Sequence, residues 1–492
     1  MGDAPATGRA VAGIANTFFL MTSSTKQRAS LGGAIEIADG RVVIHDESVI
    51  ASERFDEIAR AAVFGDGAAR DDARWLIWEL GQQLGVRCAS IHELYLARGR
   101  GEVSGFTVPA MNVRGMVYDT ARSIFRTAIR LDAGAFICEI ARSEIAYTEQ
   151  RPAEYVAVIL AAALREGFRG PVFIQGDHFQ VNAKKFAVDP VTEVAAVKQL
   201  IAEAVDAGFY NIDVDTSTLV DLSKQGLDEQ QRVNYEQAVE LTRYVREMEP
   251  DGVTISVGGE IGEVGTENST EPELRAFMDG FNRMLRQRVP GAEGLSKISV
   301  QSGTTHGGVV MADGSIADVK IDLDTLARLS RVAREEYGLS GAVQHGASTL
   351  PDGAFNNFPK TETAEIHLAT NFQNMLYDNM PPELRQEIYA WLSTSAKDER
   401  KASDSDEQFF YKTRKKAIGP FKRRLWDLAA DTKQTLASAY DEKFEFLFRQ
   451  LGVAGTAGIV RTHVTPVERH RPAPHEGMAV IEAAPDDADL SD

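Results

Sequence analysis

Between Phe106 and Thr370, short runs rich in Val, Ile, Phe and Ala alternate with longer stretches of helical spacing. Eight runs are predicted as strands: Val108–Val113, Ala135–Ala141, Val172–Asp177, Tyr210–Asp215, Thr254–Gly262, Lys297–Gly303, Gly341–Gly346 and Ala364–Thr370. Regular alternation of strand and helix is typical of a parallel sheet with helical connections. Eight such units in about 270 residues predict a closed (β/α)8 TIM barrel. An open, doubly wound sheet is the alternative.

The predicted barrel occupies residues 91–375 of a 492-residue chain, so the remainder forms extensions. Residues 1–90 are expected to hold a small hairpin at Gly33–Val43 and amphipathic helices. Residues 376–464 are predicted as a helical C-terminal extension. The helices expected after the last strand are Asn371–Asp378, Pro382–Thr394, Gln408–Asp427 and Leu436–Leu451. Residues 465–492 are rich in Pro, Ala and acids, which predicts a disordered tail.

The charge balance limits the classes of partner. The chain carries 53 Lys and Arg against 72 Asp and Glu, a net charge of −19. This balance argues against nucleic acid and an anionic membrane surface, because both attract basic faces. Two cysteines exclude a disulfide framework and suit a reducing compartment. We find no signal peptide at the N-terminus, and the longest apolar stretch, around Tyr155–Leu164, is too short to span a bilayer. A cytoplasmic protein is expected.

Four of the nine histidines fall at the C-terminal ends of predicted strands: His178, His306, His345 and His367. Side chains at these ends of a barrel converge on one face. Imidazoles from three strands would form a three-ligand site with an open position, as in catalytic zinc centres. For a single histidine, a polar loop residue is the better interpretation. Three flanked by small residues (Gly-Asp-His, His-Gly-Gly and His-Gly-Ala) favour the metal site.

Carboxylates accompany these histidines. Asp177 directly precedes His178 and is a candidate acid or base, although a helix N-cap is the alternative. Asp213 and Asp215 share one side of their strand, and paired inward carboxylates are costly unless they bind a cation or substrate. Glu260 precedes a Gly-rich acidic loop while still within a strand, so a solvated loop does not explain it.

Six segments, in order on consecutive strands, resemble the class II, metal-dependent ketose-bisphosphate aldolases. They are Val108-Pro109-Ala110-Met111-Asn112, Asp177-His178, Val214-Asp215-Thr216-Ser217, Glu260 to Thr266, Gly303-Thr304-Thr305-His306-Gly307 and His345-Gly346-Ala347-Ser348. The resemblance covers roughly Ile91 to Gln373. None of the strand ends singled out carries a lysine, which suits metal rather than Schiff-base chemistry.

The resemblance implies roles for these positions. His178, His306 and His345 would hold a catalytic Zn²⁺, and Asp215 and Glu260 a second or alternate divalent metal position. Asp177 would exchange the proton of the C4 hydroxyl, and Asn112 would orient the substrate. The backbone of Gly307 and of Gly346, Ala347 and Ser348 would cradle a phosphate, near which the family often uses a monovalent cation. Family members are usually homodimers or homotetramers.

The chain also departs from the family pattern. Glu267 is the best candidate for the C3 base, although its register is off by one in some subgroups. On the last strand His367 replaces an asparagine, and His367 and Thr370 are assigned to substrate contact. The phosphate-contacting serine is ambiguous between Ala141 and Ser143, and Arg142 could supply a phosphate cation instead.

A basic run, Lys412–Lys416 and Lys422–Arg424, stands out in this acidic chain. A solvated helix face is the simpler interpretation, and binding of a distal phosphate is the alternative. The leading functional hypothesis is reversible cleavage of fructose-1,6-bisphosphate to dihydroxyacetone phosphate and glyceraldehyde 3-phosphate, a step of glycolysis and gluconeogenesis. The same chemistry on tagatose-1,6-bisphosphate, sedoheptulose bisphosphate or another ketose-1-phosphate is the close alternative. A non-catalytic barrel subunit supporting a partner aldolase is the alternative of another class.

Overall fold

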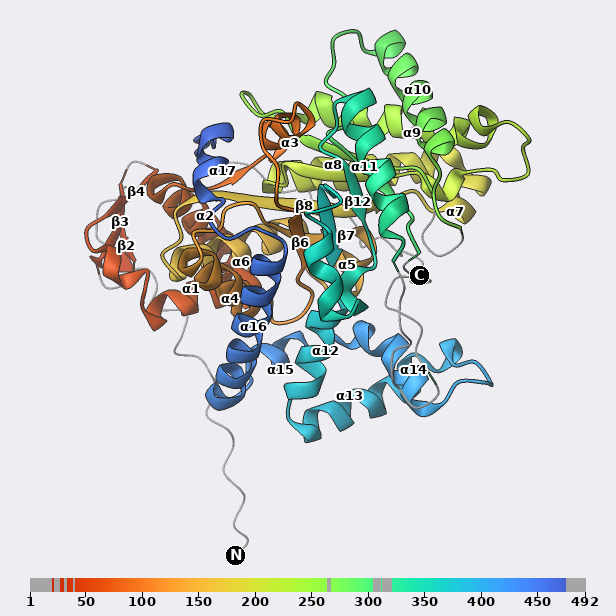
Figure 1. The fold of residues 1–492 in the computed structure, drawn as a ribbon. Coiled ribbons are helices and arrows are strands. Elements are labelled where there is room, and N and C mark those ends of the chain that lie inside the picture. Colours follow the sequence, from red (N-terminus) through yellow and green to blue (C-terminus); the bar gives the residue numbers. More distant parts are fainter. Residues whose placement is uncertain are drawn as a thin grey trace, which may run out of the picture.

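A closed barrel of parallel strands forms the centre of the computed structural model, which describes residues 20–21, 27–30, 33–38, 40–262, 267–303, 311 and 321–474 (Figure 1). Its strands are β6 (Val108–Asn112), β7 (Ile137–Ala141), β8 (Gly170–Gln180), β9 (Asn211–Asp215), β10 (Ser256–Glu260), β11 (Lys297–Val300), β12 (Ala342–Gln344) and β13 (Glu365–Leu368). Each strand pairs in parallel with the next, and β13 pairs with β6 to close the ring. The predicted (β/α)8 barrel is confirmed, and each predicted strand overlaps an observed one.

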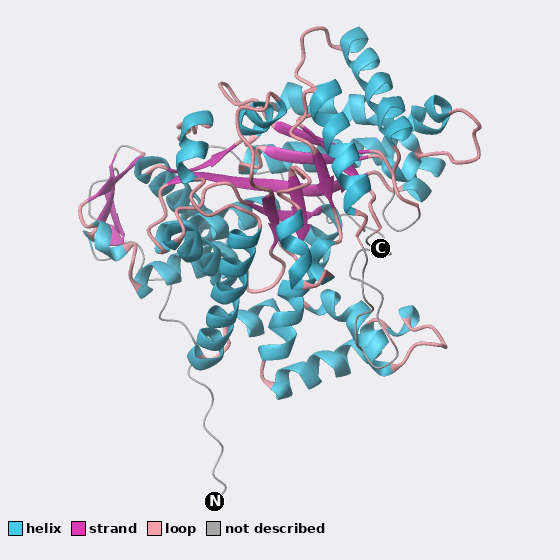
Figure 2. Cartoon of the chain, viewed as in Figure 1, coloured by secondary structure: helices cyan, strands magenta, loops and turns pink. Residues whose placement is uncertain are grey.

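Helices between the strands surround the barrel (Figure 2). They include α4 (Val117–Arg130), α6 (Pro152–Arg165), α8 (Pro190–Ala207), α9 (Leu227–Met248), α10 (Glu271–Arg288) and α11 (Leu323–Tyr337), with the shorter α5 (Arg142–Tyr147) and α7 (Ala183–Val188) after β7 and β8. Strands covered in this way read as continuous apolar runs because both of their faces are buried. Among the described helices, none combines the length and apolar character needed to cross a membrane.

A further strand, β5 (Val86–Ala89), pairs with the first residues of β8 and was not predicted. Its sequence, Val-Arg-Cys-Ala, has an arginine between apolar residues and does not stand out as an apolar run. The chain continues into α3 (His92–Gly99), whose Tyr95 is fully buried. The segment therefore lies at the end of the barrel opposite the carboxyl ends of the strands.

The N-terminal extension contains the predicted hairpin as β3 (Ile35–Ala38) and β4 (Arg41–Ile44), to which β2 (Gln27–Ser30) and β1 (Leu20–Met21) add antiparallel partners. Two helices follow, α1 (Glu53–Phe64) and α2 (Gly67–Leu84), and both pack against α6 of the barrel. The extension is thus joined to the barrel through apolar helix faces.

The C-terminal extension consists of α12 (Thr370–Asn379), α13 (Pro382–Ser395), α14 (Asp406–Thr413), α15 (Lys422–Trp426), α16 (Ala430–Gln450) and α17 (Ala457–His463). The prediction of one helix over Gln408–Asp427 is wrong, since α14 ends at Thr413 and α15 begins at Lys422. Pro420 cannot donate a helical hydrogen bond. Gly419 also approaches other backbone closely, because a Cβ there would lie 2.6 Å from the Tyr147 carbonyl oxygen.

The segment 464–474, here called the C-terminal strap, lies along α2. The indole Nε1 of Trp75 donates to the carbonyl of Arg471 at 2.9 Å, and that of Trp78 donates to Arg469 at 2.6 Å. The Arg471 guanidinium stacks 3.6 Å from the centre of the Trp78 ring. The predicted disordered tail therefore begins too early at 465, because its first residues satisfy buried donors far away in the sequence. Residues 475–492 lie outside the described part of the chain.

Candidate active site

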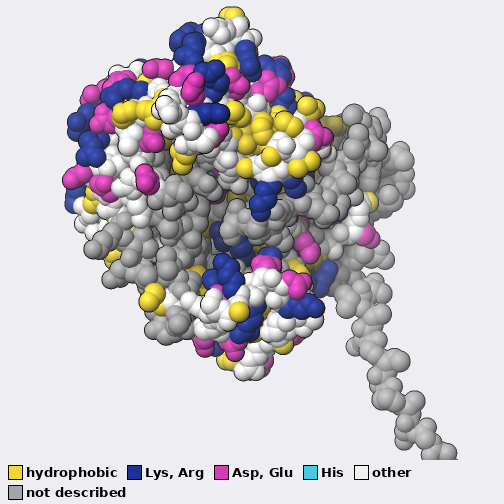
Figure 3. Space-filling view, turned by 90° about the vertical axis from the view of Figure 1, so that its right-hand side faces the viewer, with side chains coloured by type: hydrophobic (Ala, Val, Ile, Leu, Met, Phe, Trp, Pro, Cys, Tyr) yellow, Lys and Arg dark blue, Asp and Glu magenta, His cyan; other side chains and the backbone are white. Residues whose placement is uncertain are grey.

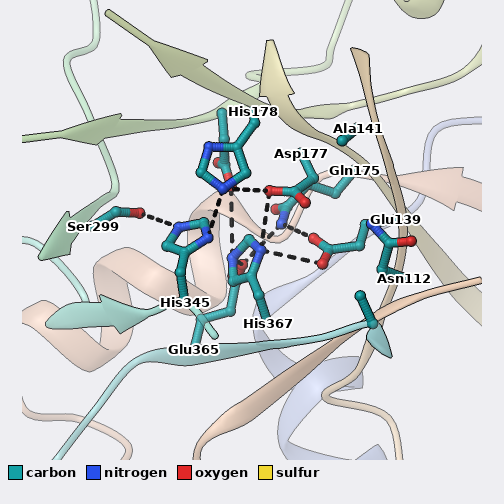
Figure 4. Close-up of polar contacts among 12 residues, drawn as sticks. Asn112, Glu139, Ala141, Gln175, Asp177, His178, Ser299, His345, Glu365 and His367 are labelled. Carbon is teal, nitrogen blue, oxygen red and sulfur yellow. Dashed lines mark hydrogen bonds and ion pairs between the residues drawn. The ribbon is translucent and has the colours of Figure 1, made fainter. Parts of the chain in front are cut away.

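An irregularity in β8 places two adjacent side chains inside the barrel. Successive residues of a regular strand face opposite sides. The register between β8 and β9 shifts between Gly176 and Phe179, and His178 has a left-handed backbone with φ 41°. Asp177 and His178 consequently both point toward the centre of the site (Figure 4). Such bulges recur beside active sites, where they redirect side chains.

Two histidines direct one nitrogen each at the same point. His178 Nδ1 lies 2.9 Å from Asp215 Oδ2, and His345 Nε2 lies 2.9 Å from Ser299 Oγ. The remaining nitrogens, Nε2 of His178 and Nδ1 of His345, are 2.8 Å apart (Figure 4). An outer partner that holds one ring nitrogen and leaves the other for a metal is the usual arrangement of a metal-binding histidine.

Glu260 adds an oxygen donor to this pair. Its Oε2 lies 3.4 Å from His178 Nδ1, and Glu260, His178 and His345 offer donor atoms within 4.8 Å of one another. Two imidazoles and a carboxylate match the donor types that zinc prefers, so the residues present fit the metal that the sequence implies. The third histidine predicted as a ligand, His306, lies outside the described residues, as does Gly307.

Asp215 holds the imidazole ring of His178 in place. Its Oδ2 accepts from Gln180 Nε2 at 2.6 Å besides facing His178, and its Oδ1 accepts from the backbone N–H and the hydroxyl of Ser217. Burial raises the pKa of Asp215, but the bonds from His178, Ser217 and Gln180 outweigh it and hold the pKa below its usual value. Asp215 is therefore an ionised carboxylate that fixes His178.

Asp177 lies between His178 and His367. Its Oδ1 is 3.7 Å from His178 Nε2 and 3.1 Å from His367 Nδ1. The side chain is buried, with 6% of the residue exposed. A carboxylate beside the two converging imidazoles is placed to exchange a proton with a molecule bound there.

The interior carboxylates divide into two groups. Burial raises the pKa of Glu260 to about 7, reinforced by Asp215, and that of Glu139 to about 7, reinforced by Asp177. Glu365 behaves oppositely: burial alone would raise its pKa, but Lys297 and His367 lower it to about 2. Carboxylates thus outnumber cations beside His178 and His345, where Glu260 lies, whereas Lys297 compensates Glu365 deeper in the barrel. This excess of carboxylates favours a bound cation near the two histidines.

Sequence reasoning missed this compensated lower layer. Lys297 and Glu365, which form it, begin β11 and β13 and are fully or almost fully buried, and Glu139, which was also missed, is fully buried within β7 beside the histidines. Charged residues inside otherwise apolar strand runs were the available indication, because a buried charge requires a partner.

The expected substrate-binding residues lie around the mouth of the barrel. Asn112 Nδ2 donates to Glu144 Oε2 at 2.5 Å, and its Oδ1 accepts from Arg114 Nε at 3.2 Å. Arg114 was not predicted, and it also forms an ion pair with Glu144 at 2.6 Å. Arg142 is engaged by Glu193 at 2.7 Å and by the carbonyl of Gln180. The Arg114 guanidinium, beside Asn112, is therefore a further cation at the site.

The remaining expected residues vary in their surroundings. Gly346 has φ 68° and precedes a short turn, Ala347–Thr349, in which Ala347 is fully buried. Ser348 Oγ accepts from the backbone N–H of Ala369 at 2.5 Å, and Thr370 begins α12. Ser143 is half-buried in α5, and Glu267 is exposed just after residues 263–266, which are not described.

The basic run lies on the C-terminal extension, where acidic side chains accompany it. Lys412 Nζ is 2.7 Å from Asp404, Lys422 Nζ is 2.8 Å from Glu154, and Lys416 pairs with Glu399. Lys and Arg side chains border a hollow between the barrel and the helices beneath it (Figure 3). Pairing of this kind favours the interpretation as an ordinary charged helix face.

Residues 100–425 match the family described as "Fructose-bisphosphate aldolase class-II". The match spans most of the chain and includes every strand of the closed barrel. The protein therefore belongs to the class II fructose-bisphosphate aldolase family. Its general class of activity is that of an aldolase, a carbon–carbon lyase. No curated protein matches the chain.

Solved structures of similar fold include the YdjI aldolase of Escherichia coli K12, which is 12% identical in sequence. The alignment covers 75% of this chain and 99% of the YdjI chain, with a TM-score of 0.45. A fructose-bisphosphate aldolase (Fba) of Campylobacter jejuni is 15% identical, covers 75% of this chain and 98% of its own, with a TM-score of 0.44. These likenesses are too distant to bear on the chemistry of this chain.

Proposed function

We propose that this protein is a zinc-dependent aldolase that reversibly cleaves a phosphorylated ketose, with fructose-1,6-bisphosphate as the first candidate substrate. The observation that carries the proposal is the convergence of His178 Nε2 and His345 Nδ1, 2.8 Å apart, while their other nitrogens are held by Asp215 and Ser299. His178 and His345 would hold the zinc together with His306, and Asp215 and Glu260 would serve a second or alternate metal position. When bound, zinc supplies a Lewis acid for the substrate carbonyl oxygen.

The protein's own residues then move the protons. In cleavage the C3–C4 bond breaks, the C4 hydroxyl proton passes to Asp177, and an aldehyde forms at C4. Carbon 3 takes a proton from Glu267, so the products are a ketose monophosphate and an aldose phosphate. In condensation the same protons return. Asn112, held by Glu144 and Arg114, would orient the hydroxyls of the substrate.

Phosphate binding is assigned to backbone and cations at the mouth. The turn from Gly346 to Ser348, together with Gly307, would present N–H groups to the phosphate next to C1, as Gly-rich loops do. Arg142 and Ser143 are the candidates on the neighbouring strand end, whereas His367 and Thr370, on the last strand, are candidates for contact with the substrate in general. A monovalent cation near this phosphate and a homodimer or homotetramer are part of the proposal, and sedimentation velocity tests the latter.

Metal analysis and a substrate panel test the proposal. We expect at least about one zinc ion per chain. Chelation should abolish triose release, and added Zn²⁺ should restore it. Fructose-1,6-bisphosphate, tagatose-1,6-bisphosphate, sedoheptulose bisphosphate and ketose-1-phosphates should be assayed side by side. A preference for tagatose-1,6-bisphosphate would support the proposed zinc-dependent cleavage and replace fructose-1,6-bisphosphate as the substrate. Zinc-loaded protein that cleaves none of them would overturn the proposal.

A further inference from the structure

The C-terminal strap joins α2 to the barrel at several points. A Cβ at Gly252, in the loop before β10, would lie 3.5 Å from the Val467 side chain. The guanidinium of Arg471 donates to the carbonyls of Asp206 and Ala207, at the end of α8, at 2.6 and 3.0 Å. Because the same segment accepts hydrogen bonds from the indoles of α2, it links the N-terminal extension to two parts of the barrel.

Two polar side chains of α2 are buried where the strap crosses this helix. Glu79 and Gln82 are each 1% exposed. Gln82 Oε1 accepts from the backbone N–H of Arg469 at 2.8 Å, and Glu79 Oε1 accepts from that of Arg471 at 2.8 Å. A neutral amide requires only hydrogen bonds, whereas a buried carboxylate also requires a positive charge nearby. In the described part of the chain, the ion-pair partner of Glu79 is His470 alone.

His470 lies between two carboxylates. Its Nδ1 is 2.5 Å from Glu79 Oε2, and its Nε2 is 2.9 Å from Glu468 Oε1. Ionised carboxylates only accept hydrogen bonds, so the ring donates to both of them when both nitrogens carry a proton and the ring is a cation. A neutral ring keeps one N–H, and one of the two carboxylates then loses its donor. The charge of His470 is therefore part of the attachment of the strap to α2.

The neighbouring arginines do not replace this charge. Arg87, on β5, pairs with Glu468 and not with the buried carboxylate of α2. The Arg471 guanidinium stacks on the Trp78 ring and donates to the carbonyls at the end of α8. The buried carboxylate therefore depends on His470 for its compensation.

The other titratable groups beside the strap gather around Tyr210, just before β9. They are Cys88, Asp206, Arg469 and Arg471. Burial raises the pKa of Tyr210 to about 12, and it also raises that of the Cys88 thiol to about 12. Both groups consequently stay neutral at the pH values at which an imidazole changes its charge.

His470 has the opposite behaviour, because its pKa lies closer to neutrality. Hydrogen bonds to Glu79 and then to Glu468 raise the pKa of His470 above its ordinary value of 6.5, against the smaller effect of partial burial. A group whose pKa is raised by folding stabilises the folded arrangement fully below its ordinary value. This stabilisation is lost as the pH rises from 6.5 through the raised value.

We propose that the C-terminal strap attaches to α2 in a pH-dependent way: the positive charge of His470 holds it against Glu79 and Glu468, and it detaches more readily when His470 becomes neutral. Detachment would expose Glu79 to water and free α2 from the contacts that the strap makes with the barrel. The strap lies along α2 and not at the histidine site, so the proposal does not depend on the proposed function.

Hydrogen exchange of the full-length protein, measured by mass spectrometry, tests the proposal. Protection factors, which correct for the intrinsic effect of pH on exchange, should be at least about threefold larger for strap peptides at about pH 6 than at about pH 8.5. Peptides of α2 should change in the same direction. Equal protection of the strap at the two pH values would overturn the proposal.

Three variants identify the groups responsible. His470→Gln cannot become charged, so its strap should be weakly protected at both pH values. His470→Arg stays charged and should keep at about pH 8.5 the protection that the wild type loses. Glu79→Gln removes the buried charge that requires a cation, so its strap should lose most of the pH dependence. An unchanged pH dependence in His470→Gln or in Glu79→Gln would overturn the proposal.

His463→Gln is the matched control. His463 is the last residue of α17, directly before the strap, and no ion pair joins it to a carboxylate within the described residues. The pH dependence of strap protection should therefore remain that of the wild type. If His463→Gln abolished this dependence as His470→Gln does, the contact between His470 and Glu79 would not be its cause, and the proposal would be wrong.

Discussion

Two regions of this molecule concentrate charge, and they differ in how the charge is compensated. In the barrel interior, carboxylates such as Glu139 and Glu260 are buried, and burial together with other carboxylates raises the pKa of each to about 7. On the C-terminal extension, Lys412, Lys416 and Lys422 lie beside carboxylates of their own. Both regions stand out in the sequence. The two regions therefore differ in compensation: the interior carboxylates are buried beside one another, whereas these three lysines of the extension each have a carboxylate partner.

The largest effect is expected at the histidine pair. His178→Ala removes one of two converging nitrogens and leaves Asp215 without its ring partner, so zinc binding and cleavage should both be lost, with kcat reduced at least about 1,000-fold. Metal content by mass spectrometry and triose release measure this, with circular dichroism to verify folding. His45→Ala, at an exposed histidine paired with Glu36, is the control and should change neither. Retained zinc in His178→Ala would remove this residue from the metal site.

Asp177 should separate chemistry from metal binding. Asp177→Asn keeps the shape but cannot take a proton, so zinc content should persist while kcat falls about 100- to 10,000-fold. Steady-state kinetics on zinc-loaded protein measure the loss. Turnover within a fewfold of the wild type would exclude Asp177 as the proton acceptor.

Glu139 gives a smaller effect that depends on pH. Its folded pKa, about 7, lies above the usual 4.5, because burial and the Asp177 charge disfavour ionisation. The unfolded chain therefore releases this proton first, and the contribution of Glu139 to stability falls as pH rises from 4.5 to 7. Glu139→Gln should match the wild type near pH 4.5 and unfold at higher denaturant at pH 8, measured without metal. A difference that does not change with pH would contradict the raised pKa.

The smallest effect is expected on the basic run. Lys412→Ala and Lys416→Ala each remove a partly exposed ion pair, worth at most about 1 kcal/mol of unfolding free energy. KM for a bisphosphate should change less than about twofold. A marked rise in KM for a bisphosphate, without one for a ketose-1-phosphate, would instead assign these cations to the distal phosphate and end the contrast between the two regions.

Local patterns were sufficient for the barrel and part of the site. Apolar runs and helical spacing predicted all eight strands, because each strand lies between helices and is buried on both faces. Ordered motifs on those strands predicted His178, His345 and Asp177, which the structure brings together. These features depend on sequence neighbours only a few residues apart.

Long-range contacts account for what was missed. The pairing of Lys297 with Asp213 and Glu365 joins three strands distant in sequence. A period of two predicts opposite faces for Asp177 and His178, and only the shifted register of β8 brings both inward. The break between α14 and α15 has a local signal in Pro420, which the prediction of one helix overlooked, whereas the close approach of Gly419 to the Tyr147 carbonyl is a long-range contact.

The C-terminal strap determines when the contacts of α2 can be completed during synthesis. Trp75 and Trp78 both belong to α2, yet the carbonyls that accept from their indoles belong to Arg471 and Arg469, which lie 396 and 391 residues further along the chain. During synthesis, α2 can form these two hydrogen bonds only after Arg471 has left the ribosome. A chain that ends before Arg469 would leave both indole N–H groups without these acceptors, so it should unfold more readily than the chain that carries the C-terminal strap.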